Sequence, residues 1–212
     1  MIYIDTMSKQ PLYIDFDNTI FNSALRICDL YNKHFRYYEG FVAAKSENIQ
    51  RSDFSDVCPL ANESNIRFFF NSPEFLAVED NGGYYWMSQK EGNHIWTTKG
   101  YLETLDRFFR IIIVSTGDTS NLALKHKFVK KYLPFADFIG LEAYDKSEVD
   151  MSDGILIDDS IVHLRTSNAA TKVLYGQKRP WDDEMTEEEK KTISWCKTWH
   201  SLYEYLTKYW GV

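Results

Sequence analysis

The sequence predicts an α/β protein with a doubly wound, parallel, Rossmann-like sheet and a mainly helical cap inserted after the first strand. From residue 99 onward, short apolar runs alternate with helical patterns, which is typical of parallel strands joined by crossover helices. Between the first apolar run and this regular part lies an irregular, aromatic-rich stretch. We therefore expect an α/β core formed by 1–20 and 99–212, and a helical, aromatic-rich cap at 21–98.

The charge balance limits the kinds of partner. The chain has 212 residues, with 24 Lys and Arg against 31 Asp and Glu, and a formal net charge of −7. A protein without a basic surplus is not suited to neutralise a nucleic-acid backbone, so we expect no nucleic-acid partner. A small phosphorylated substrate remains compatible, because it needs only one or two local cations and a metal ion.

Cysteine usage and hydropathy indicate the compartment. Cys28, Cys58 and Cys196 lie far apart without a C-x-x-C spacing, so neither a zinc site nor a disulfide framework is expected. No apolar run approaches membrane-spanning length, and the N-terminus lacks the apolar segment of a signal peptide. We expect a soluble cytoplasmic protein with no membrane partner.

The first strand signal is an apolar run from Leu12 to Ile14 that stops at Asp15 and Asp17, with Thr19 close behind. Such a run is typical of a buried parallel strand whose carboxyl end opens into a site. Two aspartates at this spacing offer hard oxygen ligands for Mg²⁺, and one of them can attack phosphorus while the other transfers a proton. Taken alone, the pattern is equally consistent with an ordinary strand-to-turn junction.

Helical patterns alternate with aromatic clusters in the expected cap. Asn22 or Ser23 can cap a helix that runs to about Tyr38. Two short helices are expected at about 60–70 and 73–80. The aromatic clusters lie at 68–70, 84–86 and 96.

The regular part of the chain predicts the remaining strands and helices of the core. In order, we expect a helix at about 99–109, a strand at 111–114, a helix at 119–133, strands at 137–141 and 155–157, a short helix, a strand at 171–175 and a long final helix. Thr186 and Glu189 form a capping-box pattern that opens this final helix. Its apolar stripe runs from Ile193 to Trp210.

Three of the predicted strands end in polar side chains. Parallel strands place their carboxyl ends at one edge of the sheet, where ligands bind in open α/β folds. We therefore expect convergence of three pairs: Asp15 with Asp17, Ser115 with Thr116, and Asp158 with Asp159.

This ordered set resembles the haloacid dehalogenase-like hydrolase superfamily. The matching features are D-x-D-x-T at 15–19, an apolar strand ending in Ser115, Lys146, and an apolar strand ending in acids at 158–159. Within the superfamily the chain looks like the 5′(3′)-deoxyribonucleotidases. That narrower likeness rests on the sequence Asp-Lys-Ser at 145–147, the aromatic-rich cap and the sequence Arg-Pro-Trp at 179–181.

Two departures from this family are visible. Asn18 stands where the family typically has Gly, and the cap is longer between residues 68 and 98 than in the family.

The resemblance implies a magnesium-dependent phosphatase and assigns a role to each motif. Asp15 would be the nucleophile that forms an aspartyl-phosphate. Asp17 would act as general acid and then as general base, and would lend its backbone carbonyl to Mg²⁺. Lys146 would neutralise the transferring phosphoryl group. The resemblance also assigns phosphoryl binding to Ser115 and Thr116, and the last metal ligand to Asp159 in preference to Asp158.

Each of these roles has a purely structural alternative. Lys146 taken alone is typical of a solvated surface lysine, Ser115 of the first residue of a helix, and the two acids at 158–159 of a helix cap. The five histidines show no ligand spacing, so we interpret them as structural or surface groups.

The cap is expected to determine the substrate. The leading hypothesis is a phosphatase for ribo- or deoxyribonucleoside monophosphates, and the resemblance favours the deoxy form. Candidates for contact with the base are Phe54, Phe69, Phe70 and Trp96. The aromatic cluster at 68–70 is also typical of a hydrophobic core. The alternatives are a phosphatase for another small phosphomonoester, such as a sugar phosphate, and a non-catalytic nucleotide-binding module. A homodimer is an open alternative to a monomer.

Overall fold

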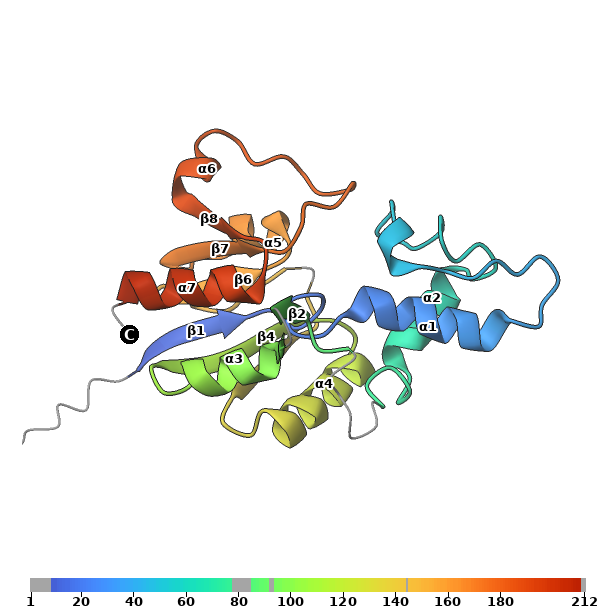
Figure 1. The fold of residues 1–212 in the computed structure, drawn as a ribbon, viewed down its shortest axis with the longest axis horizontal. Helices are drawn as coiled ribbons and strands as arrows, with labels where there is room; N and C mark the ends of the chain where they lie inside the picture. The colour runs from blue at the N-terminus through green and yellow to red at the C-terminus, as the bar shows by residue number, and fades with distance from the viewer. Residues whose placement is uncertain (1–8, 78–84, 92–93, 144, 211–212) are drawn as a thin grey trace, which may run out of the picture.

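The computed structural model describes residues 9–77, 85–91, 94–143 and 145–210. Its centre is a sheet of six parallel strands in the order β5-β4-β1-β6-β7-β8 (Figure 1). These strands are β1 (Gln10–Ile14), β4 (Phe109–Thr116), β5 (Asp137–Leu141), β6 (Ile155–Asp158), β7 (Thr171–Tyr175) and β8 (Ile193–Cys196). β1 pairs with β4 on one side and with β6 on the other, so the chain winds away from it in both directions. The predicted doubly wound α/β fold is confirmed.

Apolar residues on both faces of the strands produce two layers of helices. In β4, Ile111 and Ile113 point into one core while Ile112 and Val114 point into the other, which follows from the two-residue period of a strand. The larger core lies against α3 (Thr98–Leu105), α4 (Thr119–Tyr132) and α7 (Trp199–Trp210). The smaller core lies against α5 (Ile161–Thr166). A strand buried on both faces needs a continuous apolar run, which is why these segments were legible in the sequence.

The inserted segment contributes two helices that lie beyond the carboxyl end of β1 (Figure 1). They are α1 (Ser23–Phe35) and α2 (Glu63–Asn71), with a short 3₁₀ turn, η1 (Ser46–Asn48), between them. Asn22 caps α1 by accepting a hydrogen bond from the Leu25 amide, and Asn62 and Asn65 form a reciprocal capping box at α2.

The helix expected at 73–80 is not formed in its described part, 73–77, which consists of turns. The Arg26 guanidinium of α1 donates hydrogen bonds to the backbone carbonyls of Glu74 and Phe75. The backbone hydrogen bonds in this stretch, from Phe75 to Ser72 and from Ala77 to Glu74, span three residues, as in turns, so the chain does not continue as an α-helix.

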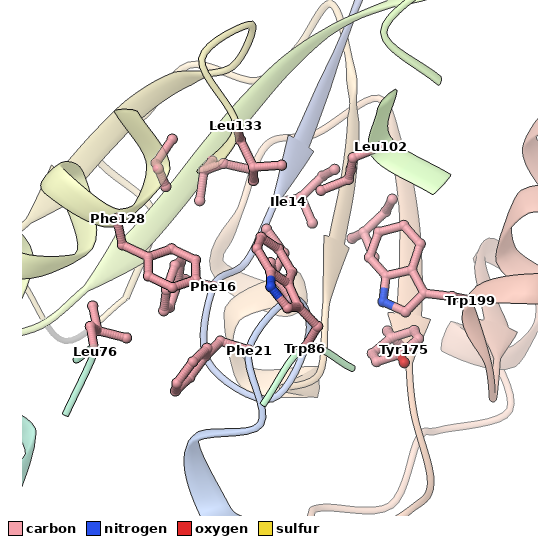
Figure 2. Packing of buried hydrophobic residues seen from close by; sticks show 14 of the residues in the cluster. Ile14, Phe16, Phe21, Leu76, Trp86, Leu102, Phe128, Leu133, Tyr175 and Trp199 are labelled. Carbon is pink, nitrogen blue, oxygen red and sulfur yellow. The ribbon is translucent and has the colours of Figure 1, made fainter. Parts of the chain in front are cut away.

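The end of the insertion returns to the core. Trp86 forms a bridge with Phe21, and the Met87 amide donates to the Ile20 carbonyl. Trp86 is 4% exposed, and its ring lies 5.3 Å from that of Phe128 in α4 (Figure 2). The chain then forms an antiparallel hairpin of β2 (Ser88–Glu91) and β3 (His94–Thr97), which the sequence did not predict.

The predicted long C-terminal helix is wrong. The capping box between Thr186 and Glu189 is present, but it opens only the four-residue α6 (Glu189–Thr192). The chain then enters β8, which pairs in parallel with β7, and only afterwards forms α7. The four residues of Ile-Ser-Trp-Cys are too few for their pattern to distinguish a helix from a strand, and pairing with β7 selects the strand. Among the described residues, no helix combines the length and apolarity needed to cross a membrane.

Candidate active site

The turn after β1 carries the two aspartates of the first motif. The Asp15 amide continues the sheet ladder by donating to the Ile157 carbonyl at 2.9 Å. Phe16, between the two acids, is fully buried and packs edge-on against Phe128 at 5.5 Å (Figure 2). Asp15 and Asp17 flank this buried ring and follow the last residue of β1, so both lie at the carboxyl edge of the sheet.

The backbone conformation of Asn18 explains why asparagine can replace the glycine that is typical of the family that the sequence resembles. Its φ is 55°, in the left-handed region that glycine and asparagine adopt most easily. Its side-chain oxygen also accepts a hydrogen bond from the Ala24 amide at 2.9 Å, which ties the turn to the start of α1.

Lys146 lies between two buried carboxylates. Its ammonium is fully buried and donates to Asp15 Oδ1 at 2.6 Å and to Asp158 Oδ2 at 2.5 Å. Burial alone would lower the pKa of Lys146, but the two carboxylates raise it above its usual value. Burial raises the pKa of Asp15 to about 6, against the opposing effect of Lys146.

Asp158 and Asp159 face different partners. The Asp158 oxygens are engaged by Lys146, by the Ser160 amide at 2.8 Å and by His163 Nδ1 at 3.2 Å. Burial opposes ionisation of Asp158, but Lys146 and His163 outweigh it and lower its pKa to about 2. Asp159 forms an ion pair with Arg179. Burial and the nearby Asp15 raise the pKa of Asp159 to about 7 even though Arg179 opposes the shift.

Ser115 and Thr116 end β4 beside Asp17, as the sequence predicted from their strand position. Ser115 is fully buried, and its hydroxyl accepts a hydrogen bond from Lys125 Nζ at 2.9 Å. The same ammonium is paired with Asp17 Oδ2. The structure thus brings together all the predicted residues at the strand ends, with Lys146 between Asp15 and Asp158.

Four residues of this cluster were missed as site residues in the sequence. Lys125 could have been found, because it lies on the apolar stripe of α4 with Leu122, Phe128 and Val129. Arg179 belongs to the Arg-Pro-Trp sequence at 179–181, but that likeness assigned it no role in the site. Ser23 and His163 carry no comparable signal, since their contacts with the aspartates depend on chain segments that meet only in the folded protein.

Two cavities lie where the inserted segment faces the core. The first, of about 650 Å³, is polar and is lined by Asp17, Lys125, Thr116 and residues of α2. The second, of about 680 Å³, lies between Phe54, Phe70 and Trp181. Phe70 lines both cavities.

The four residues predicted to contact the base lie in different places. Phe54 and Phe70 line a cavity, whereas Phe69 is 2% exposed, packs beside Phe35 and His34, and lines neither cavity. Its spacing in α2 turns it into the helix interface instead. Trp96 belongs to β3, and its side chain lies outside the described part of the structure.

The acidic residues fit a hard divalent cation. Ligand atoms of Asp15, Asp158 and His163 lie within 4.8 Å of one another, but the Lys146 ammonium already occupies the position between the two carboxylates. Asp15 is buried and the Asp159 side chain is 10% exposed, and burial raises the pKa of both carboxylates although each is paired with a cation. A cation held by oxygen donors there would stabilise both of them in the ionised form.

The sequence matches no model of a known protein family and no curated protein. Solved structures do match the fold. A haloacid dehalogenase-like family protein from Streptococcus pneumoniae superposes with a TM-score of 0.56 at 16% identity, covering 95% of this chain and 98% of its own. A predicted phosphatase from Clostridium acetobutylicum gives a TM-score of 0.55 at 12% identity, covering 94% of this chain and 99% of its own.

A third structure is a HAD-superfamily hydrolase of subfamily IA from Geobacter sulfurreducens. It superposes with a TM-score of 0.53 at 14% identity and covers 93% of this chain and 96% of its own. The protein therefore has the α/β fold of the haloacid dehalogenase-like hydrolases, with a comparable length.

Proposed function

We propose that the protein is a magnesium-dependent phosphomonoesterase that works through an aspartyl-phosphate at Asp15. The observation that carries this proposal is the pairing of each aspartate of the Asp-x-Asp turn with its own buried lysine. Asp15 is bonded to Lys146, and Asp17 to Lys125. Two carboxylates fixed side by side, one buried and one reaching a cavity, suit a nucleophile and a proton-transfer group.

In the proposed reaction, an Asp15 oxygen forms a bond to phosphorus while the ester oxygen leaves with the proton of Asp17. Asp17 then takes a proton from the water that attacks the aspartyl-phosphate, which releases phosphate and restores Asp15. Lys146 stabilises the charge on Asp15 and the phosphoryl oxygens, and Ser115 with the amides at the start of α4 can donate to those oxygens.

The metal ion would be held by the carboxylates of Asp15 and Asp159 and by the backbone carbonyl of Asp17. When bound, Mg²⁺ would neutralise charge on the phosphoryl oxygens. Asp158 would then orient Lys146, because its own oxygens are already occupied by protein donors.

We infer a deoxynucleoside monophosphate as the substrate, because the aromatic walls of the second cavity can stack a flat base and the resemblance favours the deoxy sugar. This is the activity of the 5′(3′)-deoxyribonucleotidases that the sequence resembles. The polar first cavity, lined by Glu63, Arg67 and Asn71, favours a polyhydroxylated leaving group and makes a sugar-phosphate phosphatase the second candidate. A cytoplasmic setting is consistent with three free, buried cysteines.

Phosphate release measured over a substrate panel tests this proposal. The panel contains ribo- and deoxyribonucleoside monophosphates, sugar phosphates and p-nitrophenyl phosphate, each with Mg²⁺ and with EDTA. We expect turnover that EDTA abolishes, with preference for deoxynucleotides. Preference for sugar phosphates would replace the substrate but keep the chemistry. No release from any ester would contradict phosphatase activity and favour a nucleotide-binding module.

A further inference from the structure

Lys125 is a buried lysine with no role in the motifs of the sequence. It lies in the middle of α4, on the face that packs against the sheet, and is 1% exposed. Burying an ammonium group is costly unless the protein supplies partners for it, so the position demands a specific set of acceptors.

The surroundings of Lys125 Nζ supply three acceptors. They are the Asp17 carboxylate, the Ser115 hydroxyl at 2.9 Å and, more distantly, the Thr116 carbonyl at 3.4 Å. An ammonium group has three protons to donate, so Lys125 can serve all three acceptors at once. Its ammonium also lies 5.5 Å from the centre of the Phe16 ring, the residue between the two aspartates.

Asp17 is held from two sides by different parts of the chain. Lys125 of α4 binds Oδ2, and the Ser23 hydroxyl at the start of α1 donates to Oδ1 at 2.5 Å. Its side chain is 28% exposed, and it lines the polar cavity. The carboxylate is thus fixed in direction while one face stays open to a ligand in the cavity.

The two buried lysines divide the site between them. Lys146 serves Asp15 and Asp158, and Lys125 serves Asp17 and Ser115. Lys125 is therefore the group that sets the separation between the proposed proton donor and the proposed phosphoryl-binding hydroxyl.

We propose that Lys125 is a positioning residue that directs the Asp17 carboxyl group toward the leaving-group oxygen. The same ammonium group fixes the distance between Asp17 and Ser115. This inference rests on the proposed phosphatase function. Proton donation matters most when the departing oxygen is a poor leaving group, since a good leaving group departs as an anion. Loss of Lys125 should therefore harm esters of weakly acidic alcohols much more than esters of acidic ones.

Two esters of similar shape make the comparison: phenyl phosphate and p-nitrophenyl phosphate, whose phenol is the more acidic. Lys125→Met removes the charge and keeps the chain length, Lys125→Arg keeps the charge, and Lys127→Met, at an exposed position of the same helix, is the control. We expect Lys125→Met to lower kcat about 100-fold on phenyl phosphate and about 10-fold or less on p-nitrophenyl phosphate. Lys125→Arg should recover part of the loss, and Lys127→Met should behave as the wild type.

Thermal melting of Lys125→Met, Asp17→Asn and the double variant gives a second readout that needs no turnover. Because each single substitution strands a charge or leaves a partner unpaired, the two losses in melting temperature should add up to more than the loss in the double variant. Equal losses of kcat on both esters, unchanged kcat, or strictly additive melting losses would overturn the role of Lys125. An inactive wild type would overturn the proposed function together with this inference. If the wild type is active and the variants give any of these three results, only the positioning role of Lys125 is overturned.

Discussion

Replacing Lys146 by Met tests whether the site is held together by charge. The ammonium of Lys146 is fully buried and bonds Asp15 at 2.6 Å and Asp158 at 2.5 Å. Met is similar in length and apolar, so the substitution removes the positive charge with little loss of packing. Two buried carboxylates then face each other without the cation between them.

Removing one partner of a buried ion pair costs about 3–5 kcal/mol, because the remaining charge stays desolvated. Two carboxylates are left here, so we expect a loss in the free energy of unfolding of at least about 3 kcal/mol. For a chain of 212 residues this corresponds to a fall in melting temperature of about 10 °C. Loss of the same charge from the reacting centre should lower kcat about 100- to 1,000-fold.

Urea unfolding in the presence of EDTA measures the loss in the free energy of unfolding without any contribution from a bound metal ion. The double variant Lys146→Met/Asp158→Asn should recover part of the loss, because it removes one of the two stranded carboxylates. Lys178→Met is the matched control: its ion pair with Glu184 is exposed, so its effect should stay within about 0.5 kcal/mol.

Added Mg²⁺ should stabilise Lys146→Met, since a cation near Asp15 replaces part of the missing charge. Wild-type stability in Lys146→Met, or a double variant less stable than the single one, would refute the reasoning. Either result would mean that the carboxylates do not depend on Lys146 for compensation.

Two further predictions concern the inserted helices. Asp118→Ala removes the bidentate contact of Arg67 with the start of α4, in which each bond is 2.8 Å long. It should raise KM several-fold and change stability by less than about 1 kcal/mol, because Arg67 is largely exposed. An unchanged KM would show that this contact does not shape the cleft. Phe70→Ala should raise KM for nucleotides more than for p-nitrophenyl phosphate, whereas Phe69→Ala should leave KM unchanged and cost about 3–5 kcal/mol in urea unfolding. A raised KM in Phe69→Ala with an unchanged KM in Phe70→Ala would show that the substrate contacts the Phe69 side of α2.

The central strands of the core were predictable because they are buried on two faces. Ile111 to Val114 and Ile155 to Ile157 must be apolar throughout, and the polar residues that follow them mark the strand ends directly. The strand at Asp137–Leu141 was also predicted with the bounds that the structure has. These features depend on local composition and can therefore be predicted from one sequence.

Features that depend on distant pairing were not predictable. β8 reads as a helix because Ile193 and Cys196 are three residues apart, and only its neighbour β7 makes it a strand. The ion-pair partners of Asp158 and Asp159 could not be predicted from two adjacent acids, because Lys146 and Arg179 reach them from distant parts of the chain. Lys125 is the intermediate case: its place on an apolar stripe was visible, but its partners were not.

The measurement that tests the central claim most directly is detection of the phosphoenzyme. Wild-type protein is mixed with a ³²P-labelled substrate identified in the panel, in the presence of Mg²⁺, and is quenched in acid after a few milliseconds. The account predicts protein-bound label that hydroxylamine releases, as expected for an acyl phosphate, and no label in Asp15→Asn, which should also lose turnover. Label that persists in Asp15→Asn, or turnover without any labelled wild-type protein, would contradict Asp15 as the nucleophile.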